Sequence, residues 1–242
     1  MATATGPGRT AAARGTAKVR LDRETIVAAG LELAARTGTT VISVRDLGTR
    51  LGADPTAIYR HFRNKEQLMQ ALLDELNTRA VAAVTADPTE WRDRLRQLAS
   101  ATFDEFAAHP AIAVEAVVLT THGPGELDAI ELMLDAFTRA GLGDDAVVHY
   151  YALLASHTLS TAAGIARSRS ALPPGDHDAS PWFDGPILAD PRTHPRTAAL
   201  ALEIAELEDR ELFRIGVESV IESAERAASG SGAGSRGAGS GA

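Results

Sequence analysis

Apolar residues recur along this chain at helical spacing, and turn-forming residues separate the segments. Val44, Leu47 and Leu51 follow one another at i, i+3 and i+7, which places them on one face of a short helix. Alanine and leucine abound, whereas the alternation of apolar and polar residues that is typical of strands is nearly absent. The pattern therefore predicts an all-α protein.

Glycine, proline and capping residues divide the expected helices into a head, a body and two tails. In the head, one helix is expected over residues 22–36 and two short helices within 43–65. The further expected helices span 64–84, Trp91 to His109-Pro110, 111–119, 126–139, 144–168, 196–206 and 209–228. A second capping signal, from Asp87 to Glu90, precedes the helix at Trp91. The expected divisions are a flexible basic arm (1–20), a head (21–66), a helical body (67–228) that includes a long proline-rich loop (170–195), and a Gly/Ser/Ala tail (229–242).

Residues 43–65 combine two helix starts with a glycine turn. Ser43 and Asp46 form a Ser-x-x-Asp capping box, and Asp54-Pro55 is an N-cap followed by proline at the first helical position. Gly52 between them supplies the permissive backbone of a tight turn. Two short helices joined in this way are the helix-turn-helix pattern of DNA-binding proteins.

The second of these helices should have a buried face and an exposed face. Ile58 and Phe62 are spaced i, i+4 and should point inward. Between them, Tyr59, Arg60 and His61 are left to solvent or to a partner. The helix-turn-helix interpretation makes nucleic acid the expected partner.

The stretch from Ile26 through Leu76 closely resembles the DNA-binding domain of the tetracycline-repressor (TetR) family. The matching segments are IVAAGLELAARTG and VRDLGTRLGADPTAIYRHFRNKEQL, which include Ile58-Tyr59, His61-Phe62 and Lys65. The resemblance implies an N-terminal three-helix helix-turn-helix domain followed by a helical ligand-binding and dimerisation domain. It also implies a sequence-specific transcriptional regulator, in most cases a repressor that is released from its operator by a small molecule.

Charge points to the same partner independently. Residues 1–65 hold 11 Lys+Arg against 5 Asp+Glu, whereas the remaining residues hold 13 against 27. Phosphate responds to charge within a Debye length of about 10 Å, so the local excess matters more than the acidic total. The arm of residues 1–20 contains Arg9, Arg14, Lys18 and Arg20 and no acid. Contact with DNA and a tail without a role both stay open for it.

The recognition helix should enter the major groove of double-stranded DNA at its N-terminal end. Thr56, Ala57 and Arg60 are the candidates for base edges, since arginine pairs bidentately with guanine and a methyl group contacts thymine. Pro55 is placed to touch the groove wall. Arg45, Tyr59, His61 and Lys65 are candidates for phosphates, although His61 has burial against Phe62 as an alternative.

The C-terminal half resembles the ligand-binding domains of the tetracycline-repressor class more loosely, through His157-Thr158-Leu159 and ELFRIGVESVIESAE from Glu211. The resemblance implies a homodimer held by a four-helix bundle, which suits palindromic operators. The residues expected at this interface are Ala163, Phe213, Val217, Val220, Ile221 and Ala224. Core packing within one subunit is the alternative for all of them.

The body should also contain a pocket for an unknown small-molecule effector. The large or polar-tipped candidates are Trp91, Phe103, Phe106, Met133, Phe137, Tyr150 and His157. A hydrogen-bonded core or interface histidine is the alternative for His157. The segment AIAVEAVVL offers no histidine for the magnesium that a tetracycline carries, which argues against that drug as the effector.

The remaining chemistry of the sequence excludes several classes. There is no cysteine, and His122, His149 and His157 lack metal-ligand spacing, so neither a metal nor another cofactor is expected. No HExxH, GxSxG, GxGxxG or P-loop motif occurs, and no apolar run approaches the roughly 18 residues of a membrane span. We therefore expect a cytoplasmic regulator that is not an enzyme. A helical enzyme or an interaction protein without DNA binding is the alternative.

Overall fold

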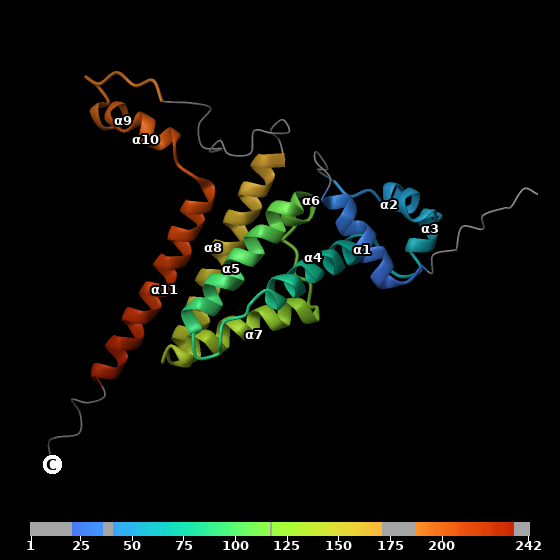
Figure 1. The fold of residues 1–242 in the computed structure, drawn as a ribbon, viewed down its shortest axis with the longest axis horizontal. Coiled ribbons are helices and arrows are strands. Elements are labelled where there is room, and N and C mark those ends of the chain that lie inside the picture. Colours follow the sequence, from blue (N-terminus) through green and yellow to red (C-terminus); the bar gives the residue numbers. More distant parts are fainter. Residues whose placement is uncertain (1–20, 36–40, 117, 171–186, 235–242) are drawn as a thin grey trace, which may run out of the picture.

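The computed structural model describes residues 21–35, 41–116, 118–170 and 187–234, and the regular structure in these ranges is entirely helical (Figure 1). This confirms the expected all-α fold. In chain order the helices are α1 (Arg23–Ala34), α2 (Val44–Leu51), α3 (Pro55–Ile58), α4 (Lys65–Ala82), α5 (Trp91–Ala108), α6 (Pro110–Ala113), α7 (Pro124–Arg139), α8 (Asp144–Ser170), α9 (Pro195–Ala199), α10 (Ala201–Ala205) and α11 (Asp209–Gly234). The predicted basic arm and most of the predicted 170–195 loop lie outside the described residues.

Helices α1, α2 and α3 form a small head at one end of the molecule (Figure 1). The side chains of Ile26, Leu47, Ile58 and Phe62 are at most 1% exposed and make up its centre. Asp22 caps α1 by accepting a hydrogen bond of 2.8 Å from the Thr25 amide. The apolar faces that periodicity predicted therefore meet one another.

Helix α4 connects this head to the body. Its first turns pack against α1, and its length lies against α5 and α7. Asn64 caps it by accepting a hydrogen bond from the Gln67 amide at 2.8 Å. Leu68, Leu72 and Leu76 are buried along one face. The head and the body thus share one continuous helix.

The body consists of α5, α7 and α8 packed around one another, with α11 laid across α5 and α8. Three arginine–carboxylate pairs join α5 to α11: Arg92–Glu225, Arg96–Glu218 and Arg210–Asp104. The Arg96 guanidinium, which donates to both Glu218 oxygens, holds the pKa of that carboxyl below its ordinary value. Apolar burial together with these ion pairs fixes α11 to its own subunit.

Several element boundaries differ from those predicted. The helix expected over 111–119 is only the four-residue α6, and the one expected over 196–206 is divided into α9 and α10 at Leu200. Helix α11 continues beyond Ser229 to Gly234, into the segment expected to be a tail. The Asp87 carboxylate bonds the Thr89 amide at 2.8 Å and does not cap α5, which begins at Trp91.

Candidate nucleic-acid interface and ligand cavity

The turn between α2 and α3 has the geometry that its residues predicted. The Ser43 hydroxyl accepts hydrogen bonds from the Arg45 and Asp46 amides at 3.2 and 3.4 Å and caps α2. Gly52 ends α2 in the left-handed conformation, with φ of 61°. Asp54 then begins α3, with Pro55 in its first turn. The two short helices are therefore set by local interactions.

The residues predicted to contact DNA lie together on the surface of the head. Arg45, Thr56, Tyr59, Arg60 and Lys65 are exposed, and Pro55, Ala57 and His61 are half-buried. Helix α3 itself ends at Ile58. The chain continues through a tight turn in which the His61 and Phe62 amides both donate to the Ile58 carbonyl, at 2.9 and 3.1 Å. Tyr59, Arg60 and His61 are thus presented from a turn rather than from a long helix.

The Thr56 hydroxyl is already engaged. It donates to the Asp54 carboxylate at 2.6 Å, and the Thr56 amide donates to the same oxygen at 2.8 Å. These two bonds lower the pKa of Asp54. The Thr56 methyl group therefore remains for a thymine methyl, while the hydroxyl hydrogen is used within the turn.

Arg23 of α1 contacts the recognition segment, residues 55–62, through Phe62 and His61. This contact was not predicted from the sequence. The Arg23 guanidinium lies over the Phe62 ring, 4.4 Å from the centroid, and donates to the His61 carbonyl at 3.4 Å. The contact spans residues far apart in sequence, so no local pattern marks it. Arg23 thereby helps to position His61 and the preceding Arg60.

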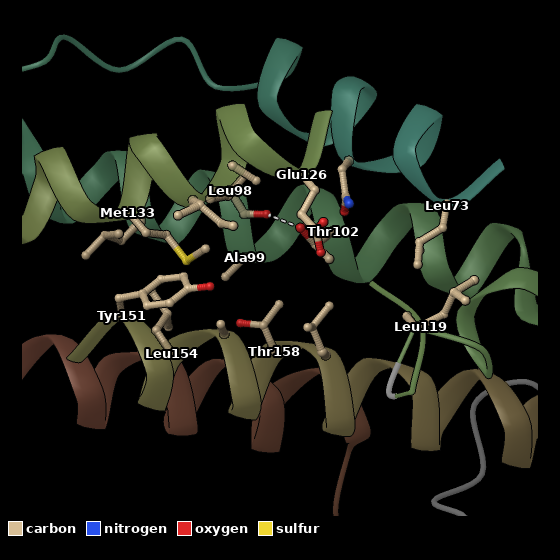
Figure 2. Close-up of a pocket in the computed structure, with 17 residues that line it drawn as sticks. Leu73, Leu98, Ala99, Thr102, Leu119, Glu126, Met133, Tyr151, Leu154 and Thr158 are labelled. Atoms are coloured by element: carbon tan, nitrogen blue, oxygen red, sulfur yellow. Dashed lines mark hydrogen bonds between the residues drawn. The ribbon is translucent and has the colours of Figure 1, made fainter. Parts of the chain in front are cut away.

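A cavity of about 90 Å³ lies inside the body, between α4, α5, α7 and α8 (Figure 2). Its walls are mainly apolar and include Leu98, Ala99, Met133 and Leu154. Drug-sized ligands occupy pockets of about 300–1,000 Å³. A ligand of that size would therefore have to part the surrounding helices.

A few polar groups also line the cavity. They are Asn77, Thr102, Glu126, Tyr151 and Thr158. The Thr102 hydroxyl donates to the Leu98 carbonyl at 2.9 Å, whereas the Tyr151 and Thr158 hydroxyls have no hydrogen-bond partner among the described residues. A mainly apolar cavity with a few polar groups is typical of small-molecule sites.

The residues that the sequence analysis assigned to a pocket lie elsewhere, with the exception of Met133. The other six side chains do not line the cavity, and their assignment to it is corrected. They pack in the core or against α11, and they are Trp91, Phe103, Phe106, Phe137, Tyr150 and His157. Most of the large rings fill the core, so the cavity is lined mainly by smaller side chains, with Tyr151 as an exception.

Tyr150 and His157 show the difference most clearly. The Tyr150 hydroxyl donates to the Ser223 carbonyl of α11 at 3.0 Å. His157 Nε2 donates to the Phe213 carbonyl at 3.0 Å, and its ring stacks on that of Phe213. Both side chains therefore hold α8 against α11, which is the alternative recognised for His157. Tyr151, the next residue, faces the cavity instead.

The residues expected at a dimer interface are also largely inside the subunit. Val220 is half-buried, and the other five are at most 4% exposed: Ala163, Phe213, Val217, Ile221 and Ala224. The five buried side chains pack between α11, α5 and α8 and have no surface left for a partner, which corrects their assignment to the dimer contact, whereas Val220 stays a prediction. The outward face of α8 instead carries small residues, Ala152, Ser156, Ser160 and Gly164, all of them exposed.

A hydrogen-bond network joins the cavity wall to α4. The Asp74 carboxylate of α4 accepts from the Gly125 and Glu126 amides at the start of α7, at 3.3 and 2.9 Å, and from the Thr121 hydroxyl at 2.9 Å. A Cβ at Gly125 would overlap the Asp74 carbonyl and the Thr78 hydroxyl, so glycine is needed for this close approach. Helix α7, which lines the cavity, is thus capped by the helix that carries the head.

The ranges that the structure describes contain neither a candidate metal centre nor a candidate membrane span. No group of three or more histidine, cysteine or carboxylate side chains there could hold a metal ion. No helix there is long and apolar enough to cross a membrane. The functional candidates are therefore the surface of the head and the cavity of the body.

A helix-turn-helix with cations on its exposed face, joined by one helix to a body with an internal cavity, defines a DNA-binding regulator with a ligand-binding domain. Comparison with known proteins agrees. Residues 26–72 match the profile of "Bacterial regulatory proteins, tetR family", and residues 85–225 match "Tetracyclin repressor-like, C-terminal domain". The chain belongs to the TetR family of transcriptional regulators.

Individual relatives support the family over most of the chain. The HTH-type transcriptional repressor Rv1353c of Mycobacterium tuberculosis is 26% identical over 213 residues, which cover 85% of this chain and 81% of the relative. A putative transcriptional regulator from Streptomyces coelicolor A3(2) superimposes with a TM-score of 0.71 and 27% identity, covering 86% of this chain and 98% of the other. ActR of Streptomyces coelicolor in complex with actinorhodin shares the fold, with a TM-score of 0.68, 20% identity and coverage of 87% and 99%.

Proposed function

We propose that this protein is a homodimeric transcriptional repressor that leaves a palindromic operator when a small molecule enters the body. The observation that carries the proposal is the Asp74 network, since it joins the cavity-lining α7 to α4 and so to the head. A repressor among the relatives and a family member bound to actinorhodin support it. Enzymatic activity has no support in the TetR family, whose members are regulatory proteins.

The release mechanism follows from the distance between the two recognition segments of a dimer. Two recognition segments occupy successive major grooves only when they are about 34–36 Å apart. A ligand that expands the small cavity would push α7 away from α5 and α8 and, through Asp74, would shift α4. Allosteric couplings of this kind typically amount to about 1–3 kcal/mol, or 5–150-fold in affinity.

The DNA contacts are tested by two substitutions on DNA selected from a random pool by the purified protein. We expect Arg60→Ala to weaken binding to the selected site by about 1–3 kcal/mol and to relax preference at one base pair per half-site. Lys65→Ala should weaken binding to all sequences and reduce the salt dependence by about one unit of slope. Both side chains are exposed, so both variants should melt like the wild type.

A gel-shift titration at several salt concentrations separates the two effects. Unchanged binding by Arg60→Ala would contradict the assigned orientation of the recognition segment. If the wild-type protein enriched no sequence at all, the repressor proposal itself would fail.

For the dimer we propose a contact through the small-residue face of α8. A groove of about 470 Å³ lies there beside α11, lined by Gly164, Ser160 and Leu212 among others. A Cβ at Gly164 would meet nothing within 4 Å inside the subunit, so a side chain there extends outward.

We expect Gly164→Leu to keep the helical fold and to weaken dimerisation at least about tenfold, because 1.4 kcal/mol of lost packing suffices for that factor. Sedimentation equilibrium measures the dissociation constant, and Gly164→Ala is the matched control that should stay close to the wild type. Equal dimerisation by Gly164→Leu would place the interface on another face.

A further inference from the structure

The lining of the cavity in the body carries a single ionisable carboxylate. It belongs to Glu126, and the lining residues include no lysine, arginine or histidine. The remaining walls are aliphatic, apart from Asn77, Thr102, Tyr151 and Thr158. An anionic ligand would therefore meet a like charge and no compensating cation in a site from which water is largely displaced.

The Glu126 carboxylate is held in place by its own segment. Its Oε2 accepts a hydrogen bond from the His122 amide at 2.6 Å and lies 3.2 Å from the Thr121 hydroxyl oxygen, which donates its one hydrogen to Asp74 at 2.9 Å. His122 has a φ of 53°, which a residue other than glycine rarely adopts, and the bond to Glu126 lies at this strained position. A carboxylate offers about four acceptor positions, so capacity remains for a ligand.

The opposite wall offers neutral polar groups. Figure 2 shows Tyr151 and Thr158 across the cavity from Thr102 and Glu126, with Met133 and Leu154 toward one end. Hydroxyl groups there can donate to a carbonyl or accept from a hydroxyl of a ligand. The lining thus combines one carboxylate, several apolar side chains and a wall that carries hydroxyl groups.

We propose that the effector is a compact, mainly apolar molecule that carries a positive charge, and that Glu126 is the residue that selects this charge. The proposal rests on the proposed function in taking the cavity as the effector site. It adds that the ligand of that site is an organic cation and that Glu126 selects its charge. Because Glu126 also bonds the segment that Asp74 holds, a cation at Glu126 contacts the pathway to α4 directly.

The test uses three probes of similar size and different charge on the full-length protein. They are benzyltrimethylammonium, its uncharged carbon isostere neopentylbenzene, and benzylsulfonate. Thermal shift and isothermal titration should rank them cation first, neutral second and anion last, with the cation about tenfold tighter than its neutral isostere. Glu126→Gln keeps an acceptor for the His122 amide and should remove this tenfold advantage while binding of neopentylbenzene persists. Glu131→Gln, which neutralises an exposed carboxylate on the same helix, is the matched control and should bind like the wild type.

Two results would overturn the inference. The first is a wild-type protein that prefers benzylsulfonate, binds all three probes equally, or binds none of them. The other is a Glu126→Gln variant that keeps the full preference for the cation. A gel shift with selected DNA and no probe is run in parallel, so that lost DNA binding, which would sink the proposed function, is distinguished from a wrong charge class.

Discussion

Replacing Phe62 by alanine is expected to abolish DNA binding by unfolding the head while the body stays folded. The Phe62 side chain is 1% exposed and lies in the small core with Ile26, Leu47 and Ile58. Truncation of a buried phenylalanine typically costs about 3–5 kcal/mol. The ring also lies under the Arg23 guanidinium, so the substitution removes that contact as well.

Chemical denaturation followed by circular dichroism should show an early transition in the Phe62→Ala variant, and the gel shift should show no complex. Phe62→Leu, which keeps most of the buried volume, should retain binding. A Phe62→Ala protein that still bound DNA like the wild type would mean that the recognition segment is held by other contacts.

Replacing Asp74 by alanine is expected to loosen α4 from α7. The carboxylate accepts three hydrogen bonds, two of them from the first amides of α7. Hydrogen bonds to a charged group contribute about 1.5–3 kcal/mol each, and the three are not additive, so we expect a loss of about 2–4 kcal/mol. The Gly125 and Glu126 amides should then exchange faster with solvent.

Hydrogen exchange measured by mass spectrometry tests this expectation directly. Glu75→Ala is the control, because Glu75 is adjacent on α4 and pairs with Arg79 in the same helix. Unchanged protection of the α7 amides in Asp74→Ala would show that α4 and α7 are joined by apolar packing alone. The route from cavity to head would then need another element.

The head was predictable because its signals are local. Ser43 and Asp54 accept hydrogen bonds from amides two or three residues later, and the Gly52 amide donates to carbonyls of α2 three or four residues earlier. Both partners of each interaction therefore fall within one short stretch of sequence. The exposed and buried faces of the recognition segment followed from the spacing of Ile58 and Phe62. Arg23 was missed because its partner, Phe62, is distant in sequence.

The cavity was not predictable in the same way, because a cavity depends on where side chains fail to fill space. Large rings such as Phe103 and Phe137 were natural candidates, and they occupy the core instead. Tyr150 and Tyr151 are consecutive and therefore about 100° apart around the helix, so one side chain lies toward α11 and the other toward the cavity. Only the packing of α8 decides between them.

The position of Asp74 within α4 determines how far the head would travel. Asp74 lies nine residues after Lys65, about 14 Å along the helix axis at 1.5 Å per residue. A rotation of about 10° around this point would displace the Lys65 end by roughly 2–3 Å, an estimate that uses the same helical rise. In a two-fold dimer the displacement occurs at both ends, so the separation of the heads could change by up to twice that amount. Hydrogen bonds to bases and phosphates tolerate only a few tenths of an ångström, so α4 converts a small adjustment beside the cavity into the loss of both half-sites.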